Sequence, residues 1–216
     1  MVAYLKRLHD VHIVVVDNAS SYPPLLDWLA ATDVEVVRLK ENVGYRCVWK
    51  RGLIPLGSDH RKRFGTDWYV VSDPDLDISS CPLDCVQVLA EGLSRRPRYV
   101  KVGLSLEIQD LPDHYAHKQS VLVWERGHWL PGKRVDGTFF HSAIDTTFAV
   151  YHCDRPYQED AWIAPSLRAD RPYTARHLPW YCDLDNLDEE ELFFLRSLQT
   201  KTHWSGLNRN VALHKN

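Results

Sequence analysis

Three aspartates spaced two residues apart follow directly on an apolar segment, and their types and spacing could do chemistry together. Asp73, Asp75 and Asp77 come after Trp68–Val71, which the sequence predicts to be a buried strand. Carboxylates gathered at the edge of a hydrophobic core repel one another unless a cation or a set of donors offsets the cost of desolvation. Carboxylate oxygens suit Mg²⁺ or Mn²⁺, and Mg²⁺ is usually held by one or two carboxylates together with substrate phosphates. The simpler alternative is an acidic turn whose aspartates cap the next helix, because Asp is common in turns.

Apolar segments alternate with helical segments through the first half of the chain, and these elements must position the carboxylates. We expect strands over Val11–Val16, Val34–Leu39 and Trp68–Val71, and helical segments over Pro23–Ala31, Tyr45–Leu53 and Leu83–Arg95. Such alternation predicts a parallel α/β sheet that is covered by helices on both faces. Ligands bind such sheets beyond the carboxyl ends of the strands, so the three strand ends should meet at one crevice.

The second half of the chain is less periodic. We expect strands over Val100–Leu106 and Thr147–Tyr151, a helix near Pro112–Lys118, a hairpin over Val121–Phe139 and a long functional loop over Ala161–Asp188. A last helix over Asp188–Leu198 should be capped by the side chain of Asp188, with three glutamates at its positive N-terminal end.

The composition is that of one soluble globular domain, with 216 residues of which 44% are hydrophobic and 25% are charged. The net charge of −3 argues against nucleic-acid binding, which needs a positive field. The basic run His60–Arg63 predicts a solvated surface loop, with a docking site for an anionic partner or a membrane as the alternative.

Cysteine usage and the lack of long apolar segments bear on the compartment. The five cysteines are odd in number and show no Cys-x-x-Cys spacing, which argues against a disulfide framework and a zinc ribbon. No apolar run of about 18 residues and no basic-apolar signal sequence occurs. The sequence therefore predicts a cytoplasmic protein without a membrane span, for which peripheral membrane association stays open.

Three short segments at the strand ends resemble a known family. Val14–Ser20 reads Val-Val-Val-Asp-Asn-Ala-Ser, Asn42–Arg46 reads Asn-Val-Gly-Tyr-Arg, and Ser72–Asp75 reads Ser-Asp-Pro-Asp. In order and spacing they are similar to nucleotide-sugar-dependent glycosyltransferases of the GT-A fold, within the large family that includes bacterial polysaccharide transferases. The resemblance implies one GT-A domain over residues 1–216, with a Rossmann-like, mixed but mostly parallel sheet sandwiched by helices. Its nucleotide-binding half would span residues 1–106, and its acceptor-binding half, with a C-terminal loop and helix, residues 107–216.

The resemblance also implies an activity and its ligands. Such a protein moves a sugar from a nucleoside-diphosphate donor, expected here to be a UDP-sugar, to a glycan or other saccharide acceptor in polysaccharide biosynthesis. Mn²⁺ or Mg²⁺ would be held by Asp73 and Asp75, and Asp73 would also belong to the ribose contacts. The other implied contacts with the nucleotide or its phosphates are Asp17, Asn18, Asn42, Gly44 and Arg46.

One part of the family pattern is missing. Family members normally begin with an additional strand, whose following loop contributes to the base pocket, whereas Met1–Asp10 supplies only the end of a helix. We therefore expect one neighbour in the sheet to lack a partner strand and to leave apolar surface uncovered.

Candidates for the catalytic base lie in the second half of the chain. Transfer with inversion needs one carboxylate to deprotonate the acceptor hydroxyl. Asp145 comes just before the apolar segment Thr147–Tyr151 and is the first candidate, with Glu107 as the second and Asp110 as a further one. A role in a turn or a cap is the alternative for Asp145.

Two late histidines complete the candidate site. The resemblance implies a histidine as the third metal ligand, and we expect His203 in that role. His177 could instead bind phosphate together with Arg176, in a segment whose aromatic and cationic residues suit a lid over a sugar diphosphate. A surface or packing role is the alternative for each histidine.

Two other functions fit parts of the pattern. A sugar nucleotidyltransferase shares the α/β sheet and the metal, but it should show an early glycine-rich, basic phosphate loop, which is not visible in the sequence. A non-catalytic nucleotide-sugar-binding module would account for the missing first strand.

Overall fold

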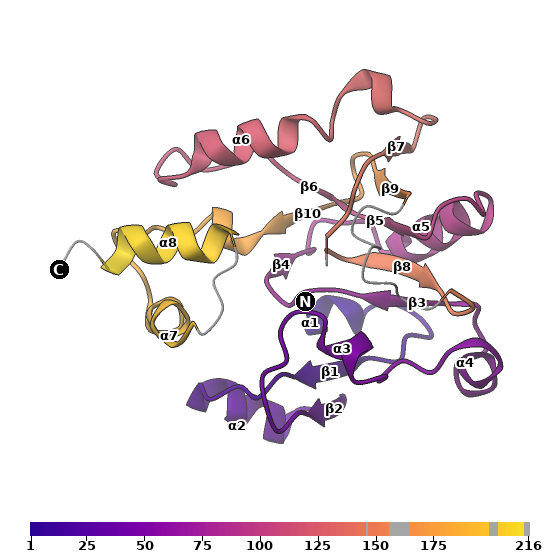
Figure 1. Ribbon diagram of the computed structural model, residues 1–216, viewed down its shortest axis with the longest axis horizontal. Coiled ribbons are helices and arrows are strands. Elements are labelled where there is room, and N and C mark those ends of the chain that lie inside the picture. Colours follow the sequence, from indigo (N-terminus) through magenta and orange to yellow (C-terminus); the bar gives the residue numbers. More distant parts are fainter. Residues whose placement is uncertain (146, 156–164, 199–202, 214–216) are drawn as a thin grey trace.

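Helices and strands alternate through the first half of the chain in the computed structural model, which describes residues 1–145, 147–155, 165–198 and 203–213. The helices in these ranges are α1 (Val2–Leu5), α2 (Pro23–Ala31), α3 (Cys47–Lys50), α4 (Gly57–Phe64), α5 (Cys85–Ser94), α6 (Lys118–Arg126), α7 (Glu189–Ser197) and α8 (His203–Leu213). The strands are β1 (Val14–Asp17), β2 (Glu35–Arg38), β3 (Trp68–Val71), β4 (Leu76–Asp77), β5 (Lys101–Gly103), β6 (Ser105–Leu106), β7 (Phe139–His141), β8 (Ala149–His152), β9 (Ser166–Ala169) and β10 (Thr174–His177). The chain is a mixed α/β protein (Figure 1).

The described strands form three sheets, and most of their ladders are antiparallel. β1 and β2 form a parallel pair, and the smaller sheet β4-β10-β6 has β10 antiparallel to β4 and parallel to β6. In the five-stranded sheet β3-β8-β5-β9-β7, β5 and β9 run parallel and the other neighbours run antiparallel. The prediction of a mostly parallel sheet is therefore wrong, because β8 enters antiparallel between β3 and β5. Apolar patterning predicts that β8 is a strand but contains no information about its direction.

The hydrophobic core lies between α5 and the five-stranded sheet. Apolar residues recur along α5 every three to four positions, so Leu89 and Leu93 share the face that packs into the core. Val102 in the middle of β5 is fully buried. At the next residue, Gly103, a Cβ atom would lie 2.6 Å from the carbonyl oxygen of Phe148, so glycine permits a close approach of the chain that leads into β8. This packing holds β8 against β5, and β8 pairs in turn with β3, the strand that precedes the acidic segment.

Most of the predicted elements are present, and three of them have the predicted start, bounds or cap. α2 begins at Pro23, as the paired prolines indicate, and β3 has the predicted bounds. α7 is capped as predicted: Asp188 accepts the amide of Glu191 at 2.8 Å, and the Glu191 side chain accepts the amide of Asp188 at 2.9 Å.

Several predictions for the second half are wrong. α6 occupies the first part of the predicted hairpin, and the helix predicted near Pro112–Lys118 begins only at Lys118. The predicted loop Ala161–Asp188 contains the strands β9 and β10, while its residues 161–164 lie outside the described ranges.

The basic run His60–Arg63 lies on α4 rather than in a loop. The helix ends at Gly65, whose φ of +69° favours glycine. His60 is buried, with its Nε2 3.0 Å from the carbonyl oxygen of Trp68, and Arg61 pairs with Asp154. His60 is therefore part of the interior and Arg61 is part of an ion pair. Both contacts weaken the alternative that the run is a docking site for an anionic partner.

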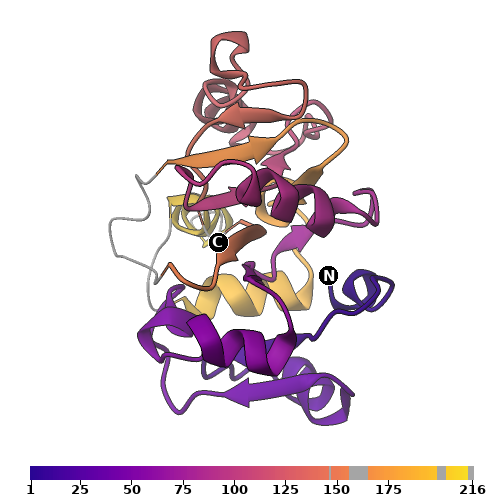
Figure 2. The same ribbon diagram turned by 90° about the vertical axis from the view of Figure 1, so that its right-hand side faces the viewer.

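The strands β1 and β3 each end a sheet. Among the described strands, β1 pairs with β2 alone and β3 pairs with β8 alone. In Figures 1 and 2, α2 and the β1–β2 pair lie at one end of the molecule and α6 lies at the other. Val11 and Val14 are 39% and 40% exposed, although the sequence predicts a buried strand there. Apolar side chains are therefore partly exposed at this edge of the described structure.

Candidate functional site

The end of β10 lies against the acidic segment. β4 and β10 pair antiparallel, so that Asp77 lies opposite Arg176. Just beyond the strand, the amide of Leu178 donates to the carbonyl oxygen of Asp75 at 2.9 Å. A segment that the sequence predicts to be a loop is thus a strand that carries Arg176 and His177 to the acidic segment.

Asp75 and His177 bring a carboxylate and an imidazole together. Oδ2 of Asp75 lies 3.3 Å from Nε2 of His177, and the histidine ring packs edge-on against Trp180 with ring centroids 4.8 Å apart. Oδ1 of Asp75 and Nδ1 of His177 are buried and have no hydrogen-bond partner among the described residues. Buried polar atoms are nearly always paired, so the lack of a partner at these two atoms is unusual. Carboxylate oxygen and imidazole nitrogen both bind divalent metals, so the residues present fit a metal ion.

Asp77 takes the structural role that the sequence leaves as the alternative for the acidic segment. Its Oδ1 accepts the amide of Ser79 at 2.9 Å, and its Oδ2 lies 3.5 Å from Nη1 of Arg176. The hydrogen bond from Ser79, followed by the charge of Arg176, lowers the pKa of Asp77 although burial opposes the shift. Asp77 therefore caps a turn and orients Arg176.

The charge of Asp73 acts on Cys47, the first residue of α3. Burial raises the pKa of the Cys47 thiol, and the negative charge of Asp73 raises it further. Cys47 is the first residue of α3, directly after the Asn42–Arg46 segment. The three aspartates thus lie in three surroundings, with Asp73 toward the predicted nucleotide contacts and Asp75 beside a histidine.

The loops after β1 and β2 lie side by side. The side-chain amide of Asn18 donates to Oδ1 of Asn42 at 2.9 Å and to the carbonyl oxygen of Gly44 at 3.1 Å. Gly44 has a φ of +85°, a conformation that favours glycine. The Arg46 guanidinium donates to the hydroxyl of Tyr45 at 2.7 Å and lies 5.1 Å from its ring centroid. The predicted nucleotide contacts Asn18, Asn42 and Gly44 are therefore brought together, with Arg46 two residues further on.

The loops after β1 and β2 (Asn18–Ser20 and Asn42–Arg46) form what we call the loop cluster, and the side chain of Asp17 stabilises the first of these loops. Its side chain is fully buried, with Oδ1 accepting the amide of Ser20 at 2.9 Å and Oδ2 accepting Nε of Arg38 at 3.0 Å. Burial alone would raise the pKa of Asp17, but the Ser20 hydrogen bonds and the Arg38 guanidinium lower it below its ordinary value. A direct contact with the base or ribose does not fit this geometry, because both carboxylate oxygens are used and neither reaches the surface.

Arg176 and His177 lie on opposite faces of the β4-β10-β6 sheet. Successive side chains of a strand point to opposite faces. Arg176 faces a polar pocket of about 230 Å³, whereas His177 lies opposite Leu76 and against Trp180, both of which are buried. A joint role of Arg176 and His177 at one phosphate, as predicted, does not fit this alternation. The pocket is lined by Ser80, Glu107, Gln109, Asp110, Arg171, Thr174, Ala175 and Arg176.

The carboxylates in this pocket are engaged by arginines. Arg171 donates to Glu107 through Nη2 at 2.6 Å and Nε at 2.8 Å, and two backbone amides donate to the same carboxylate at 2.9 Å. Burial would raise the pKa of Glu107, but Arg171 and these amides hold it below its ordinary value. Asp110 accepts Nε of Arg176 and the hydroxyl of Tyr181, each at 2.6 Å. A general base needs an accessible lone pair and a pKa near the working pH, so the predicted roles of Glu107 and Asp110 as bases do not fit their contacts.

Asp145 is an exposed residue in the segment between β7 and β8. Its carbonyl oxygen accepts Nζ of Lys101 at 3.3 Å. Burial lowers the pKa of Lys101 to about 8, an effect that the charge of Asp145 opposes and that of Arg168 reinforces. His203 is the first residue of α8, and its side chain lies outside the described part of the structure. Asp145 therefore stays a candidate for the base, and the role of His203 as a ligand stays a prediction.

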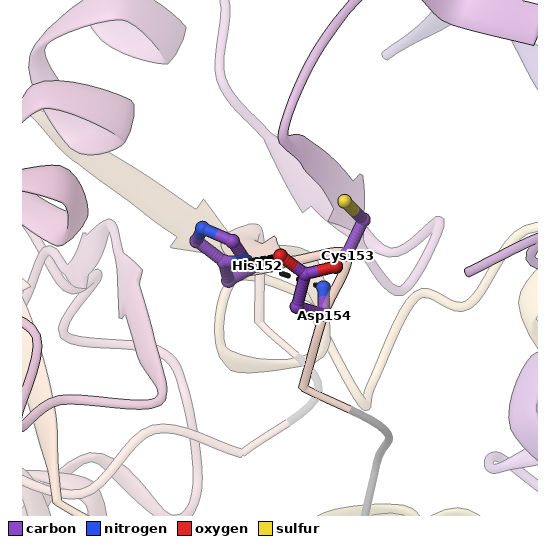
Figure 3. Close-up of side chains that lie close together, drawn as sticks. All are labelled: His152, Cys153 and Asp154. Atoms are coloured by element: carbon purple, nitrogen blue, oxygen red, sulfur yellow. Dashed lines mark hydrogen bonds and ion pairs between the residues drawn. The ribbon is translucent and has the colours of Figure 1, made fainter. Parts of the chain in front are cut away.

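A second cluster, which sequence reasoning missed, lies at the end of β8. One ligand atom of each of His152, Cys153 and Asp154 lies within 4.8 Å of the others (Figure 3). Both oxygens of Asp154 accept hydrogen bonds from Arg61, which lowers the pKa of the carboxyl group. Cys153 is fully buried, and burial raises the pKa of its thiol. The consecutive His-Cys-Asp triplet was the available signal, but a protonated thiol and a paired carboxylate make a poor metal site.

Comparisons of the chain with protein-family models, with curated proteins and with solved structures found no match. No helix in the described part of the chain is both long enough and apolar enough to cross a membrane. Function has to be inferred from the geometry of the site.

Proposed function

We propose that this chain is a metal-dependent glycosyltransferase of GT-A type, which moves a sugar from a nucleoside-diphosphate donor to a glycan or other saccharide acceptor. The pair Asp75–His177 carries the proposal, because Oδ2 of Asp75 and Nε2 of His177 face each other at a distance at which one ion can contact both atoms. A carboxylate and an imidazole within 3.3 Å of each other are suitable ligands for Mn²⁺.

The charges of this region favour a cation. Asp73, Asp75 and Asp77 place three acidic side chains within five residues, and Arg176 offsets part of their charge through its pairing with Asp77. A diphosphate would therefore be repelled from the acidic segment. A divalent ion held by Asp75 and His177 would neutralise the diphosphate and stabilise it as a leaving group.

The loop cluster after β1 and β2 supplies a surface for the nucleotide. Gly44 leaves open space beside this surface, because apart from its chain neighbours no heavy atom of the described residues lies within 4 Å of the position that a Cβ would take. Asn42 is exposed beside it, and Arg46 adds positive charge two residues further on. A UDP-sugar remains the expected donor.

Asp145 is the carboxylate that best suits the role of base. It is exposed, and it lies in the segment just before β8. In this proposal Asp145 accepts the proton of the acceptor hydroxyl as the sugar is transferred. A reducing, cytoplasmic location is part of the proposal, and the five free cysteine thiols support it.

One observation favours the non-catalytic module instead. In the described part of the chain the β1–β2 pair shares no ladder with β3, so the loop cluster and the Asp75–His177 pair are carried by separate sheets. A module of this kind would bind the sugar nucleotide without transferring the sugar.

Calorimetry with UDP, in the presence and absence of Mn²⁺, tests the metal site. We expect UDP to bind only with Mn²⁺, and we expect Asp75→Ala to abolish this binding while the circular dichroism spectrum stays unchanged. Asp27→Ala removes an exposed carboxylate on α2 and serves as the matched control. Equal UDP affinity of the Asp75→Ala variant and the wild type would overturn the role of Asp75.

Release of nucleoside diphosphate from UDP-, GDP- and dTDP-sugars separates the transferase from the module. Asp145→Asn should keep Mn²⁺-dependent binding of UDP and lose acceptor-dependent release. Binding of donors by the wild type without any release, across a panel of saccharide acceptors, would favour the module.

A further inference from the structure

The polar pocket opposite His177 takes no part in the metal and nucleotide contacts proposed above. Its volume is about 230 Å³. This is below the range of about 300–1,000 Å³ that is typical of pockets for drug-sized ligands, and it suits a ligand of one ring. Ser80, Gln109 and Thr174 add neutral hydroxyl and amide groups to a lining that is otherwise made mainly of ion pairs.

The arginines of the pocket are already neutralised by protein carboxylates. Arg171 makes two hydrogen bonds to Glu107, at 2.6 and 2.8 Å. Arg176 donates to Asp110 at 2.6 Å and lies 3.5 Å from Asp77. A phosphate or carboxylate ligand would have to compete with these carboxylates for the guanidinium groups. An anionic ligand is therefore disfavoured, because like charges would be brought together in the same small space.

The same ion pairs present hydrogen-bonding groups in a defined orientation. Nη1 of Arg171 and Nη2 of Arg176 take no part in these pairs and carry further N–H groups, and both arginines line the pocket. The Arg171 guanidinium also stacks on Trp129, 4.1 Å from the ring centroid, which holds its plane. Hydroxyl groups on neighbouring carbons of a sugar both donate and accept and carry no charge. They match a lining of oriented guanidinium N–H groups, carboxylate oxygens and neutral polar side chains.

We propose that this pocket binds one neutral hexose unit of the saccharide acceptor through hydroxyl groups on neighbouring ring carbons, and that this unit is not the one that reacts, because the pocket and His177 lie on opposite faces of the sheet. The identification of that sugar as the acceptor rests on the proposed transferase function. The preference for a neutral sugar rests on the pocket alone. Arg171 and Gln109 are the binding residues, and Glu107 positions Arg171.

Saturation-transfer NMR on the full chain, without metal or nucleotide, tests the pocket. The probes are the methyl glycosides of glucose, galactose and mannose, and the methyl glycoside of glucuronic acid as the anionic counterpart. We expect at least one neutral glycoside to bind, and the glucuronide to bind at least about tenfold more weakly. Arg171→Met should weaken binding of the neutral glycoside at least about tenfold, and the milder Gln109→Ala severalfold. Arg95→Met, at an exposed arginine of α5, is the matched control and should bind as the wild type does.

Three results would overturn the proposal: no binding of any neutral glycoside, tighter binding of the glucuronide, or no effect of both pocket substitutions. The assay is independent of UDP and Mn²⁺. If the protein binds a saccharide but not UDP, the proposed transferase function is refuted and the proposed sugar pocket is retained. If it binds UDP in the presence of Mn²⁺ but binds no saccharide, the proposed sugar pocket is refuted.

Discussion

The buried ion pair between Glu125 of α6 and Arg168 of β9 gives a quantitative test of the packing beneath α6. Nη1 of Arg168 donates to Oε2 of Glu125 at 2.6 Å, and its Nε donates to the carbonyl oxygen of Ala143 at 2.6 Å. The side chain of Arg168 is 6% exposed and that of Glu125 is 2% exposed. Glu125→Gln keeps the shape of the side chain and leaves the guanidinium charge uncompensated in the interior. Loss of one partner of a buried pair costs about 3–5 kcal/mol, and we expect about 3 kcal/mol because the glutamine oxygen still accepts a hydrogen bond.

Urea unfolding at pH 7 measures this loss of free energy. Glu91→Gln breaks a pair with Arg95 at 2.9 Å on the surface of α5, where the side chains are 63% and 73% exposed, and it should cost only about 0.3–0.5 kcal/mol. The double variant Glu125→Leu/Arg168→Met removes both buried charges and should recover most of the loss. The reasoning is refuted if Glu125→Gln destabilises the protein no more than Glu91→Gln does.

Three further predictions concern single side chains. Asp188→Ala removes the capping box of α7 and should lower the free energy of unfolding by about 1 kcal/mol, which thermal melting would record as a shift of a few degrees; an unchanged melting temperature would contradict it. The pKa of Lys101 is lowered from 10.5 to about 8, so the unfolded chain binds this proton more tightly, and wild-type stability should rise as the pH goes from about 8 to 10.5. Lys101→Met should flatten that rise in urea unfolding, and parallel pH profiles of the two proteins would count against it. His177→Gln should weaken Mn²⁺ binding at least about tenfold in calorimetry, with the exposed His9→Gln as control, and an unchanged affinity would remove His177 from the metal site.

Elements with strong local signals could be predicted from the sequence. The paired prolines at Pro23 start α2, and Asp188 caps α7, because these residues act on the backbone beside them. α6 was missed because Val121–Trp124 is a continuous apolar run that suits a strand. β9 was missed because Arg168 in its centre reads as polar, while the partner that allows its burial is Glu125, 43 positions away. Long-range pairing of this kind leaves no mark on local periodicity.

The candidate site, too, could be predicted only in part from the sequence. The acidic segment could be located from its spacing after β3, but the different surroundings of Asp73, Asp75 and Asp77 depend on β10, which the sequence does not reveal. The partner of Asp75 is His177, 102 positions later in the numbering. Only the strand geometry shows that His177 and Arg176 serve opposite faces.

The open edge of β1 affects how easily this part of the protein unfolds locally. Among the described residues, neither buried hydrophobic cluster includes a residue of α2, β1 or β2. Units with few shared apolar contacts open locally at a lower free energy than central strands do. Backbone amides of β1 and β2 should therefore exchange with deuterium earlier than those of β5. A sugar nucleotide that spans from the Asn18–Gly44 loops to Asp75 would act as a clamp between the two parts, and its binding would slow exchange in the peripheral pair.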